Sequence, residues 1–591
     1  MNILGISCFF HDAAAALLRD GELIAAAEEE RFTRKKHDYE FPVNAIKFCL
    51  DHGEIRSEDL DLVVFFEKPF LKFERLLMSV MQTFPRSRKV FQESMITWLT
   101  DKLWVKGLIQ QHLHVPVEKI VFSDHHLSHA ASAFFCSPFE EAAILTVDGV
   151  GEWATATYGI GRGTDIKLLR EIRFPHSLGL LYSAFTAFLG FEVNEGEYKV
   201  MGMAPFGQPR YADKVWKLIR QDSDGSFCLA MQYFSFHHST DTTYSPKFLE
   251  LFGPARDPKA LFFTPSSGFP EYFGGRPHDY DALARQNQHY ADIAASIQLV
   301  TEEVLLKMAM RLHRETGLPS LCMAGGVALN SVANGRILRE TPFQELFIHP
   351  AAGDGGGAVG ACLYGYHMVL GRPRKFVMRH AYWGQSHGEG EISAFLRTQR
   401  IPHRCIADDD KLVERAVDLL QEGKVVGWFQ GRFEWGPRAL GNRSILADPR
   451  KPEMKDIVNT KIKFREPFRP FAPSVPMGRV TDFFDLPEPA RHLPARYMLY
   501  VVPVKEPMRS RVPAITHVDG TARLQTVDQA EAPRYHRLIE AFGEATGVPV
   551  LLNTSFNLKG EPIVNTPAEA FSTFSRSGMD ALILGNHVIE K

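Results

Sequence analysis

Two histidines four positions apart, His125 and His129, are the first candidates for chemistry in this sequence. They belong to the run Asp124-His-His-Leu-Ser-His129. A helix over residues 124–135 would place both imidazoles on one face, as two ligands of one metal ion require. Surface pairs at this spacing also arise by coincidence, so the pair needs further ligands before it indicates a metal. His126 would point elsewhere and is expected to hydrogen-bond within the protein.

Two aspartates supply those further ligands. Asp148 ends an apolar strand, and Asp354 lies in a loop rich in glycine, positions from which a carboxylate projects into a cleft. Aspartate is also common at such positions for local hydrogen bonding. Two histidines with one or two carboxylates and open coordination positions suit iron(II), with manganese and zinc as alternatives. Such an ion would act as a Lewis acid on a substrate oxygen.

Glycine-rich loops interleave with these candidate ligands. Loops of this kind can present backbone N–H groups to phosphate oxygens, although each alone is more often a tight turn. None matches a known nucleotide-binding fingerprint, but several in one region favour a nucleotide cleft. The run 195–207 could line the same cleft, with a packed loop as the alternative. The candidate nucleotide-binding residues are Asp12, Gly149, Gly151, Gly196, Lys199, Gly202, Gly325, Gly326 and Asn330.

Cations concentrate in the C-terminal part, in residues 436–444 and 459–469. The alternation in Lys461-Ile-Lys-Phe-Arg465 predicts a strand with its cations on one face. A solvated basic face is the ordinary interpretation, but nearby aromatic residues favour a lined pocket. Convergent arginine and lysine side chains suit a phosphate dianion, because a guanidinium binds two oxygens at once. The runs 517–523 and 553–557 add small polar donors.

The elements that would position these residues form two similar units. Residues 2–18 with the Asp20-Gly21 turn predict a β-meander, and residues 142–159 predict a second. This duplication is typical of actin-like, sugar-kinase-like ATPases, in which two lobes clamp a nucleotide. Apolar residues at helical spacing predict a helix over 292–313, ended by Gly317.

The length of 591 residues exceeds what one hydrophobic core usually organises. The polar breaks in residues 371–388 mark the expected boundary. We therefore expect an α/β protein with a domain over 1–372, a linker over 373–387 and a second domain over 388–591 with a twisted mixed sheet.

The composition narrows the class of substrate and the place of action. A formal net charge of −3 offers no field to attract nucleic acid or an anionic membrane. No apolar run approaches the roughly 20 residues that span a bilayer, and the first residues lack the features of a secretion signal. Seven scattered cysteines without a C-x-x-C pair favour a reducing cytoplasm. We expect a small-molecule substrate.

Taken together, the motifs resemble those of the nodulation and antibiotic-biosynthesis O-carbamoyltransferases, a family that includes the tobramycin, cephamycin and novobiocin enzymes. The resemblance runs through nearly the whole chain. It is carried by F-H-D-A-A-A-A-L-L at 10–18, E-E-E-R-F at 28–32, D-H-H-L-S-H-A-A-S-A at 124–133, G-E-Y-K-V-M-G-M-A-P-F-G at 196–207, G-G-V-A-L-N at 325–330, G-P-R-A-L-G-N-R-S at 436–444 and N-T-S-F-N at 553–557.

The resemblance implies an actin-like N-terminal domain similar to the threonylcarbamoyl-transfer protein, and a C-terminal domain that makes carbamoyl-adenylate from carbamoyl phosphate and ATP with Mg²⁺. The N-terminal domain would then transfer the carbamoyl group to the hydroxyl of a small acceptor. By motif, His125, His129, Asp148 and Asp354 match an iron site. His11, as the base, and Lys36 match residues near the transferred group. The carbamoyl-phosphate pocket is matched by Arg438, Lys463, Arg469, Arg523 and Ser555.

Three other interpretations stay open or are set aside. A small-molecule kinase on the actin-like fold would leave the arginine-rich second domain unexplained. A hydrogenase-maturation carbamoyltransferase would carry cysteine-pair zinc fingers, which this sequence lacks. A non-catalytic scaffold fits poorly with the intact His11 and metal set. The acceptor and the oligomeric state are left open, with a homodimer as the candidate assembly.

Overall fold

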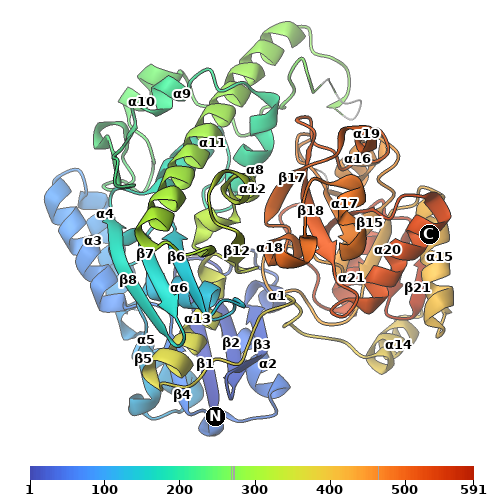
Figure 1. Cartoon of the computed structure of the whole chain (residues 1–591), viewed down its shortest axis with the longest axis horizontal. Helices are drawn as coiled ribbons and strands as arrows, with labels where there is room; N and C mark the ends of the chain where they lie inside the picture. Colours follow the sequence, from blue (N-terminus) through green and yellow to red (C-terminus); the bar gives the residue numbers. More distant parts are fainter. Residues whose placement is uncertain (101, 268, 270–272, 464) are drawn as a thin grey trace. The chain divides into compact units, whose positions relative to one another are not determined.

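The chain divides into two compact units in a computed structural model that describes residues 1–100, 102–267, 269, 273–463 and 465–591. The first unit comprises residues 1–26 and 39–377, and the second comprises 27–38 and 378–591. Figure 1 shows the course of the chain. Residues 27–38 group with the C-terminal unit, which the expected division did not include, because their charged side chains bond to loops of that unit.

The first unit contains two five-stranded sheets that repeat one topology. The strand orders are β3-β2-β1-β4-β5 and β8-β7-β6-β11-β12. In each sheet the first strand, β1 or β6, pairs antiparallel with the next strand and parallel with a later one. The duplicated actin-like architecture predicted from the sequence is thereby confirmed. The strands are β1 (Asn2–Ser7), β2 (Ala14–Arg19), β3 (Glu22–Glu28), β4 (Leu62–Phe65), β5 (Ile120–Phe122), β6 (Glu141–Val147), β7 (Ala154–Arg162), β8 (Asp165–Arg173), β11 (Ser320–Ala324) and β12 (Glu345–Ile348).

Two helices connect the sheets of the first unit and carry candidate ligands. Helix α6 (His125–Phe134) packs on β6 and β11, whereas α13 (Gly357–Leu363) packs on β1 and β2. The two helices also pack against each other. They approach closely because Gly360 has no side chain: a Cβ there would lie 1.9 Å from the Ser128 carbonyl oxygen.

Turns and helix ends follow the sequence signals. Asp20 and Gly21 both have positive φ, 50° and 91°, as the tight turn between β2 and β3 requires. The long helix α11 (Tyr280–Thr316) contains the predicted 292–313 segment. It ends at Gly317, whose φ of 67° lets its N–H reach the His313 carbonyl oxygen. These predictions are confirmed, with the helix longer than the apolar stripe indicated.

The second unit is built on a nine-stranded mixed sheet of order β13-β21-β20-β14-β15-β19-β16-β18-β17. Apolar residues of α15 (Asp409–Gln421) and α20 (Pro533–Thr546) form a core against this sheet. The predicted mixed sheet is confirmed. The strands are β13 (Arg404–Cys405), β14 (Val426–Phe429), β15 (Arg443–Ala447), β16 (Ala472–Pro476), β17 (Tyr500–Pro503), β18 (Thr521–Val527), β19 (Leu551–Ser555), β20 (Ala581–Leu584) and β21 (His587–Glu590).

One predicted element is wrong. Residues 461–463 of the alternating run do not form a strand, because α16 (Met454–Val458) continues into a π-helical segment over Asn459–Lys463. Residue 464 lies outside the described residues. The helical course brings Asn459 beneath Arg465, whose Nε donates to the Asn459 Oδ1 at 2.8 Å. Alternation over so short a run cannot distinguish a strand from a helix. Among the described residues, no helix combines the length and apolar character needed to cross a membrane.

Candidate metal centre and anion pocket

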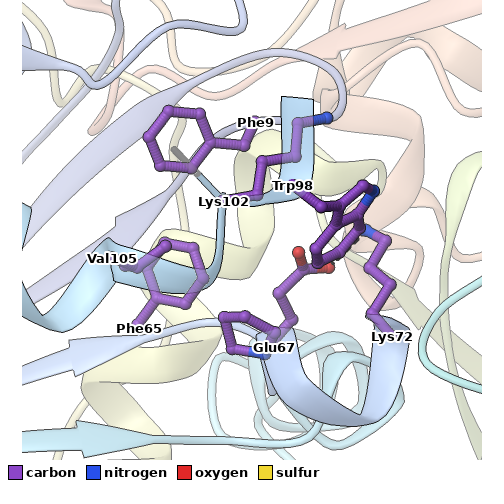
Figure 2. A pocket seen from close by; sticks show the side chains of 8 residues that line it. Phe9, Phe65, Glu67, Lys72, Trp98, Lys102 and Val105 are labelled. Carbon is purple, nitrogen blue, oxygen red and sulfur yellow. Dashed lines mark hydrogen bonds and ion pairs between the residues drawn. The ribbon is translucent and has the colours of Figure 1, made fainter. Parts of the chain in front are cut away.

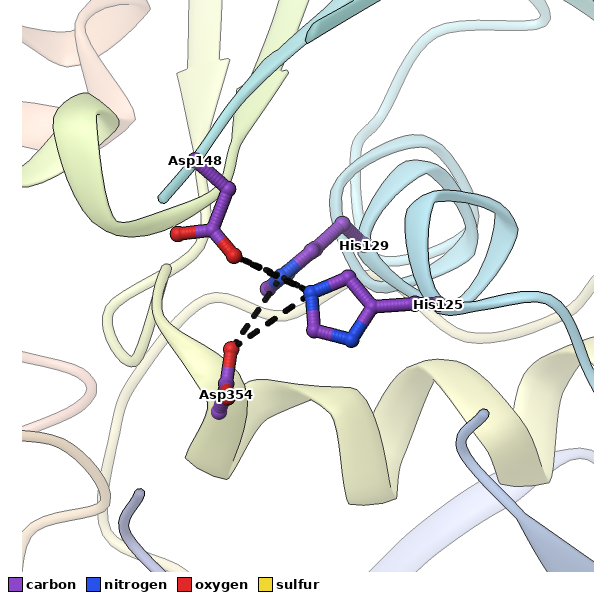
Figure 3. A group of neighbouring side chains, drawn as sticks. All are labelled: His125, His129, Asp148 and Asp354. Atoms are coloured by element: carbon purple, nitrogen blue, oxygen red, sulfur yellow. Dashed lines mark hydrogen bonds and ion pairs between the residues drawn. The ribbon is translucent and has the colours of Figure 1, made fainter. Parts of the chain in front are cut away.

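Four buried side chains of the first unit converge on one point (Figure 3). The Nε2 atoms of His125 and His129 lie 3.1 Å apart. Asp148 Oδ2 lies 3.0 and 3.5 Å from these two nitrogens, and Asp354 Oδ1 lies 3.6 and 3.5 Å from them. The structure thus brings together all four predicted metal ligands.

Local structure explains why the four side chains meet. His125 and His129 are one helical turn apart at the start of α6, so both rings lie on the same face. Asp148 follows the end of β6, and Asp354 begins a short 3-10 turn, Asp354–Gly356, ahead of α13. Since α6 and α13 pack against each other, the carboxylates reach the helix face from two different loops.

The spacing and chemistry of this cluster fit a transition-metal ion. Ligand atoms that each lie about 2.1 Å from one ion are roughly 3.0–3.5 Å from one another, close to the distances found. Asp354 Oδ2 and His129 Nδ1 are buried without a hydrogen-bond partner among the described residues. Two imidazoles with two carboxylates are a donor set for iron(II), manganese or zinc.

The electrostatics of the site also favour a cation. Burial alone would lower the pKa of His125, but the carboxylates of Asp354, Asp148 and Glu67 outweigh it and raise the pKa to about 10. The pKa of His129 is raised as well, again against the effect of burial, by Asp148 and Asp354. Positive charge is therefore stabilised here, and a divalent ion can supply that charge in place of protons.

A second layer of carboxylates supports the histidines. Glu67 Oε2 lies 3.4 Å from His125 Nδ1 and 2.6 Å from Lys72 Nζ, and both partners of this ion pair are buried. Figure 2 shows Glu67 and Lys72 among residues that line a small cavity. Burial would raise the pKa of Glu67, but Lys72 and His125 lower it to about 2. Glu152 accepts the His125 backbone N–H at 2.9 Å and so fixes the start of α6.

His126 has the structural role expected for it. Its Nε2 donates to the Ala154 carbonyl oxygen at 2.9 Å, and its Nδ1 accepts from the Thr146 hydroxyl at 2.6 Å. Burial and the neighbouring imidazoles lower its pKa to about 3. The ring is therefore neutral, and both of its nitrogens are hydrogen-bonded within the protein.

Several glycines of the glycine-rich loops permit close packing around the candidate metal ligands. The Gly326 N–H donates to Asp148 Oδ1 at 2.9 Å and orients that ligand. A Cβ on Gly325 would lie 2.2 Å from the Val147 carbonyl oxygen, and one on Gly151 would lie 3.0 Å from the His125 ring. Around Gly149, by contrast, a Cβ would meet no heavy atom within 4 Å.

The other candidate nucleotide-binding residues have local partners. Asn330 caps α12 (Ser331–Glu340) by accepting the Ala333 N–H at 3.2 Å. Gly196 precedes α8 (Glu197–Met203), which contains Gly202 as a buried residue, and Lys199 Nζ lies 5.6 Å from the centroid of the Phe191 ring. Their role toward a nucleotide stays a prediction.

The two candidate transfer residues belong to different units. His11, in the first unit, places Nδ1 2.7 Å from Asp12 Oδ2 and Nε2 3.0 Å from the Asn194 carbonyl oxygen. Burial opposes protonation, but Asp12 outweighs it, so that the pKa of His11 rises to about 9. Lys36 is half-buried in the 27–38 segment, which groups with the second unit. Asp12, predicted to bind nucleotide, is thus the ion-pair partner of His11.

In the second unit, the structure brings Lys463 and Ser555 together. Lys463 Nζ donates to the Ser555 backbone oxygen, to Ser555 Oγ at 3.2 Å and to Asn557 Oδ1 at 2.8 Å. Ser555 Oγ in turn donates to Asn557 Oδ1 at 2.7 Å. Asn553 of the same motif faces the interior, where its amide donates to Gln525 Oε1 at 2.8 Å. Burial lowers the pKa of Lys463 well below its usual value, and Arg465 and Arg469 add to the effect.

Four arginines interact electrostatically in this region: Arg465 and Arg469 act on both Lys463 and Arg523, and Arg438 acts on Arg523. Enclosure lowers the pKa of the Arg523 guanidinium well below its usual value, and the charges of Arg438, Arg465 and Arg469 lower it further. The Nε of Arg523 is buried without a hydrogen-bond partner among the described residues. A cluster of mutually repelling guanidinium groups is stabilised when an anion binds among them. We call the set Arg438, Lys463, Arg465, Arg469, Arg523 and Ser555 the anion pocket.

Sequence reasoning missed several residues of these sites. Arg465 was noted only as part of an alternating run, although its charge acts on both Lys463 and Arg523. Glu67 adjoins no recognisable motif, and Glu152 directly follows the Gly149–Gly151 loop without being singled out; only the fold brings both to His125. A hydrophobic strand ending in Phe65-Phe-Glu67 gave a weak signal, since a carboxylate at the end of a buried strand needs a partner.

Comparisons with known proteins match both halves of the chain. The family described as "Carbamoyltransferase N-terminus" matches residues 2–363, and "Carbamoyltransferase C-terminus" matches residues 417–591. An uncharacterized protein of Synechocystis sp. is 45% identical over 626 positions, covering 100% of this chain and 97% of the relative. Nodulation protein NolNO of Sinorhizobium fredii is 38% identical over 595 positions, covering 99% of this chain and 79% of the relative.

Similarities to solved structures are weaker. HypF from T. kodakarensis matches with a TM-score of 0.31 and 14% identity, over 63% of this chain and 48% of that protein. ROK hexokinase from Thermus thermophilus matches with a TM-score of 0.27 and 15% identity, over 61% of this chain and 98% of that protein. The family assignment rests on the sequence matches alone, and it confirms the predicted resemblance. The chain is a member of the carbamoyltransferase family, and hence a transferase.

Proposed function

We propose that this chain is an ATP-dependent O-carbamoyltransferase that makes carbamoyl-adenylate and transfers the carbamoyl group to a hydroxyl of a small natural product or sugar. The observation that carries the proposal is the presence of two chemically different sites. The first unit holds two histidines and two aspartates suited to a cation. The second holds the anion pocket, in which neighbouring arginine charges repel one another and would be stabilised by a bound anion.

The anion pocket would bind the phosphate dianion of carbamoyl phosphate. Arg438, Arg469 and Arg523 offer guanidinium groups to its oxygens, while Ser555 Oγ offers a neutral donor. Overall, carbamoyl phosphate, ATP and water would give carbamoyl-adenylate, phosphate and pyrophosphate. Water would first cleave carbamoyl phosphate to carbamate and phosphate. The carbamate oxygen would then form the new bond to the α-phosphorus as pyrophosphate leaves. A mixed anhydride with AMP is a better carbamoyl donor to alcohols than carbamoyl phosphate is.

Transfer would take place at the first unit. His125, His129, Asp148 and Asp354 would hold iron(II), with manganese or zinc as alternatives. When bound, this ion supplies Lewis-acid stabilisation of negative charge on the oxygens of the donor. His11, once deprotonated, would accept the proton of the acceptor hydroxyl, and Asp12 would stabilise the imidazolium that results. AMP would leave as the carbamate ester forms.

The proposed substrate class and cellular location of the reaction follow from the composition of the chain. We propose that the acceptor is a small hydroxylated molecule and that the enzyme acts in the cytoplasm, without nucleic acid or membrane as partner. A single chain carrying both half-reactions would shelter the labile adenylate from water. We also propose that the protein assembles as a homodimer.

The products of ATP turnover test the function directly. The protein is incubated with ATP, Mg²⁺, Fe²⁺ and carbamoyl phosphate, and nucleotides are separated by chromatography. The proposal expects pyrophosphate release and, with an acceptor, a mass gain of about 43 daltons on the acceptor. Formation of ADP instead would indicate a kinase and overturn the adenylate route. The His129→Ala variant is expected to lose transfer while part of the pyrophosphate release survives.

A further inference from the structure

The loop that carries Arg438 is organised by a buried carboxylate. Glu434 is fully buried, and its Oε1 accepts the backbone N–H groups of Leu440, Asn442 and Arg443 at 2.7, 2.8 and 3.1 Å. These three contacts fix the part of the loop that follows Arg438. They leave the preceding part, around Gly436, to be held by other groups.

Those groups come from the E-E-E-R-F motif, whose role the proposed function leaves unassigned. The Gly436 N–H donates to Glu28 Oε1 at 3.0 Å, and Arg31 Nη2 donates to the Gly436 carbonyl oxygen at 2.9 Å. The partners are 408 and 405 positions apart in the sequence. Both polar groups of this one residue are thus engaged by side chains from the start of the chain.

Within the motif, Glu28, Glu30 and Arg31 form a buried network. Arg31 lies 3.2 Å from Glu28 Oε2 and 2.7 Å from Glu30 Oε1, and its side chain is 4% exposed. Its guanidinium carbon also lies 4.6 Å from the centre of the Phe433 ring, at the start of the Arg438 loop. Because each charge has a partner, the network can remain buried without an unpaired ion.

A second contact reaches the loop that follows Ser555. Arg34 donates to the backbone oxygens of Ile563 and Pro562 at 2.6 and 2.8 Å and lies 3.3 Å from Glu569. The same loop is tied to Asn557, whose amide donates to the Glu561 carbonyl oxygen at 2.7 Å. Arg34 therefore supports the loop that contains the partners of Lys463.

We infer that residues 28–34, here called the strap, are a positioning element of the anion pocket. One end fixes the backbone two residues before Arg438, and the other fixes the loop after Ser555 and Asn557. This inference rests on the proposed function, since it assigns the strap to the carbamoyl-phosphate site. Glu28, Arg31 and Arg34 would act on the phosphate only through Arg438 and the 555–557 segment.

A positioning role predicts weaker anion binding rather than loss of the fold. The hydrophobic core of the second unit is built by α15, α20 and the central strands, and none of its members belongs to the strap. Without the strap, the two loops would have to become ordered when the anion binds, and that ordering opposes binding. The saturated rate would change less than the affinity, because Arg438 can still reach its productive position.

Binding of inorganic phosphate to the full chain, measured by isothermal titration calorimetry, tests the inference. The Arg31→Met and Arg34→Met variants are each expected to bind phosphate about ten- to a hundredfold more weakly. In pyrophosphate release, both should raise the KM for carbamoyl phosphate with little change in kcat, and Arg31→Lys should recover part of the affinity. Arg415→Met is the matched control, since Arg415, on α15 of the same unit, pairs with Glu590 at 2.6 Å rather than with a pocket residue.

The outcomes separate this inference from the proposed function. If the unaltered protein binds no phosphate, the anion pocket itself is wrong and the strap loses its assigned role. If the unaltered protein binds phosphate and both strap variants bind it equally well, the inference alone is overturned. Should Arg31→Met fail to fold because it leaves Glu28 and Glu30 buried without their partner, Arg34→Met decides the question, since the Arg34 side chain is 27% exposed.

Discussion

Three carboxylates surround the imidazoles of His125 and His129 in the candidate metal centre, and they favour the binding of a cation there. Asp148 and Asp354 face the Nε2 atoms of both rings, whereas Glu67 lies behind His125 at Nδ1. A cation bound at Nε2 requires the proton of the neutral ring to sit on Nδ1. The Glu67 carboxylate, 3.4 Å from Nδ1, favours that tautomer through its charge and makes the ring a stronger ligand. Lys72 keeps Glu67 ionised despite its burial.

Replacing Glu67 is therefore expected to weaken metal binding without removing a ligand. Glu67→Gln should lower the affinity for Mn²⁺ by about 10- to 100-fold, measured by competition with a chelator. Because this change leaves Lys72 buried without its carboxylate, the double variant Glu67→Gln/Lys72→Met is measured beside it. Glu74→Gln, an exposed change on α3 (Pro69–Thr83), the helix that carries Lys72, is the control. Equal affinities in all four proteins would contradict the role of Glu67.

The neighbouring Asp12 should set the pH dependence of transfer. The pKa of His11 is raised to about 9, chiefly because Asp12 outweighs burial. As a base, His11 must first lose its proton, so kcat/KM for the acceptor should rise with pH up to about 9. Asp12→Asn removes the raising charge, so the rise should end near or below the ordinary histidine pKa of about 6.5. The maximum rate should fall, because the base is weaker. An unchanged pH profile would exclude His11 as the group that titrates.

At the scale of elements, glycines permit the close packing of α13 on both β1 and α6, which brings the candidate metal ligands together. Gly5 in β1 would place a Cβ 2.0 Å from the Ala358 carbonyl oxygen, and Gly360 would place one 1.9 Å from the Ser128 carbonyl oxygen. Backbone atoms cannot move aside as a flexible side chain can. The small residues therefore set how far the Asp354 loop lies from the histidine helix.

Gly360→Ala is expected to push α13 away from α6. Overpacking of this kind costs about 1–3 kcal/mol, so thermal unfolding should begin at a lower temperature. The bound Mn²⁺ measured per protein should fall as well, because Asp354 moves with α13. Gly107→Ala on α5 (Val105–Leu113) is the control, since a Cβ there meets nothing within 4 Å. Equal stability and metal content in both variants would show that the two helices can separate without consequence.

Local signals predicted most elements, because turns and helix ends depend on a few adjacent residues. The Asp20-Gly21 turn, the end of α11 at Gly317 and the spacing of His125 and His129 are of this kind. Contacts between segments far apart in the sequence could not be predicted from local signals. Nothing in the residues around Glu28 indicates that its carboxylate meets Gly436, 408 positions later. The strand predicted over 461–465 was wrong because the signal was too short: five residues fit the two-residue period of a strand and the 3.6-residue period of a helix equally well.

At the scale of the whole molecule, each unit has a core and a candidate ligand site of its own. The metal ligands all belong to the first unit, and the anion pocket belongs to the second. A ligand that binds only the folded form of one unit stabilises that unit by mass action, about 2.7 kcal/mol at a hundredfold excess over Kd. The two ligands should therefore act on different unfolding events.

Differential scanning calorimetry can separate these events. Mn²⁺ is expected to raise the temperature of one transition, and inorganic phosphate that of another. His129→Ala should abolish the shift caused by Mn²⁺ and leave the phosphate shift intact, whereas Arg523→Met should do the reverse. If either variant abolishes both shifts, the two sites are energetically linked, and activation and transfer would have to be treated as one cooperative process. If each variant abolishes only the shift of its own ligand, the two ligands stabilise the two units separately, as expected for two compact units.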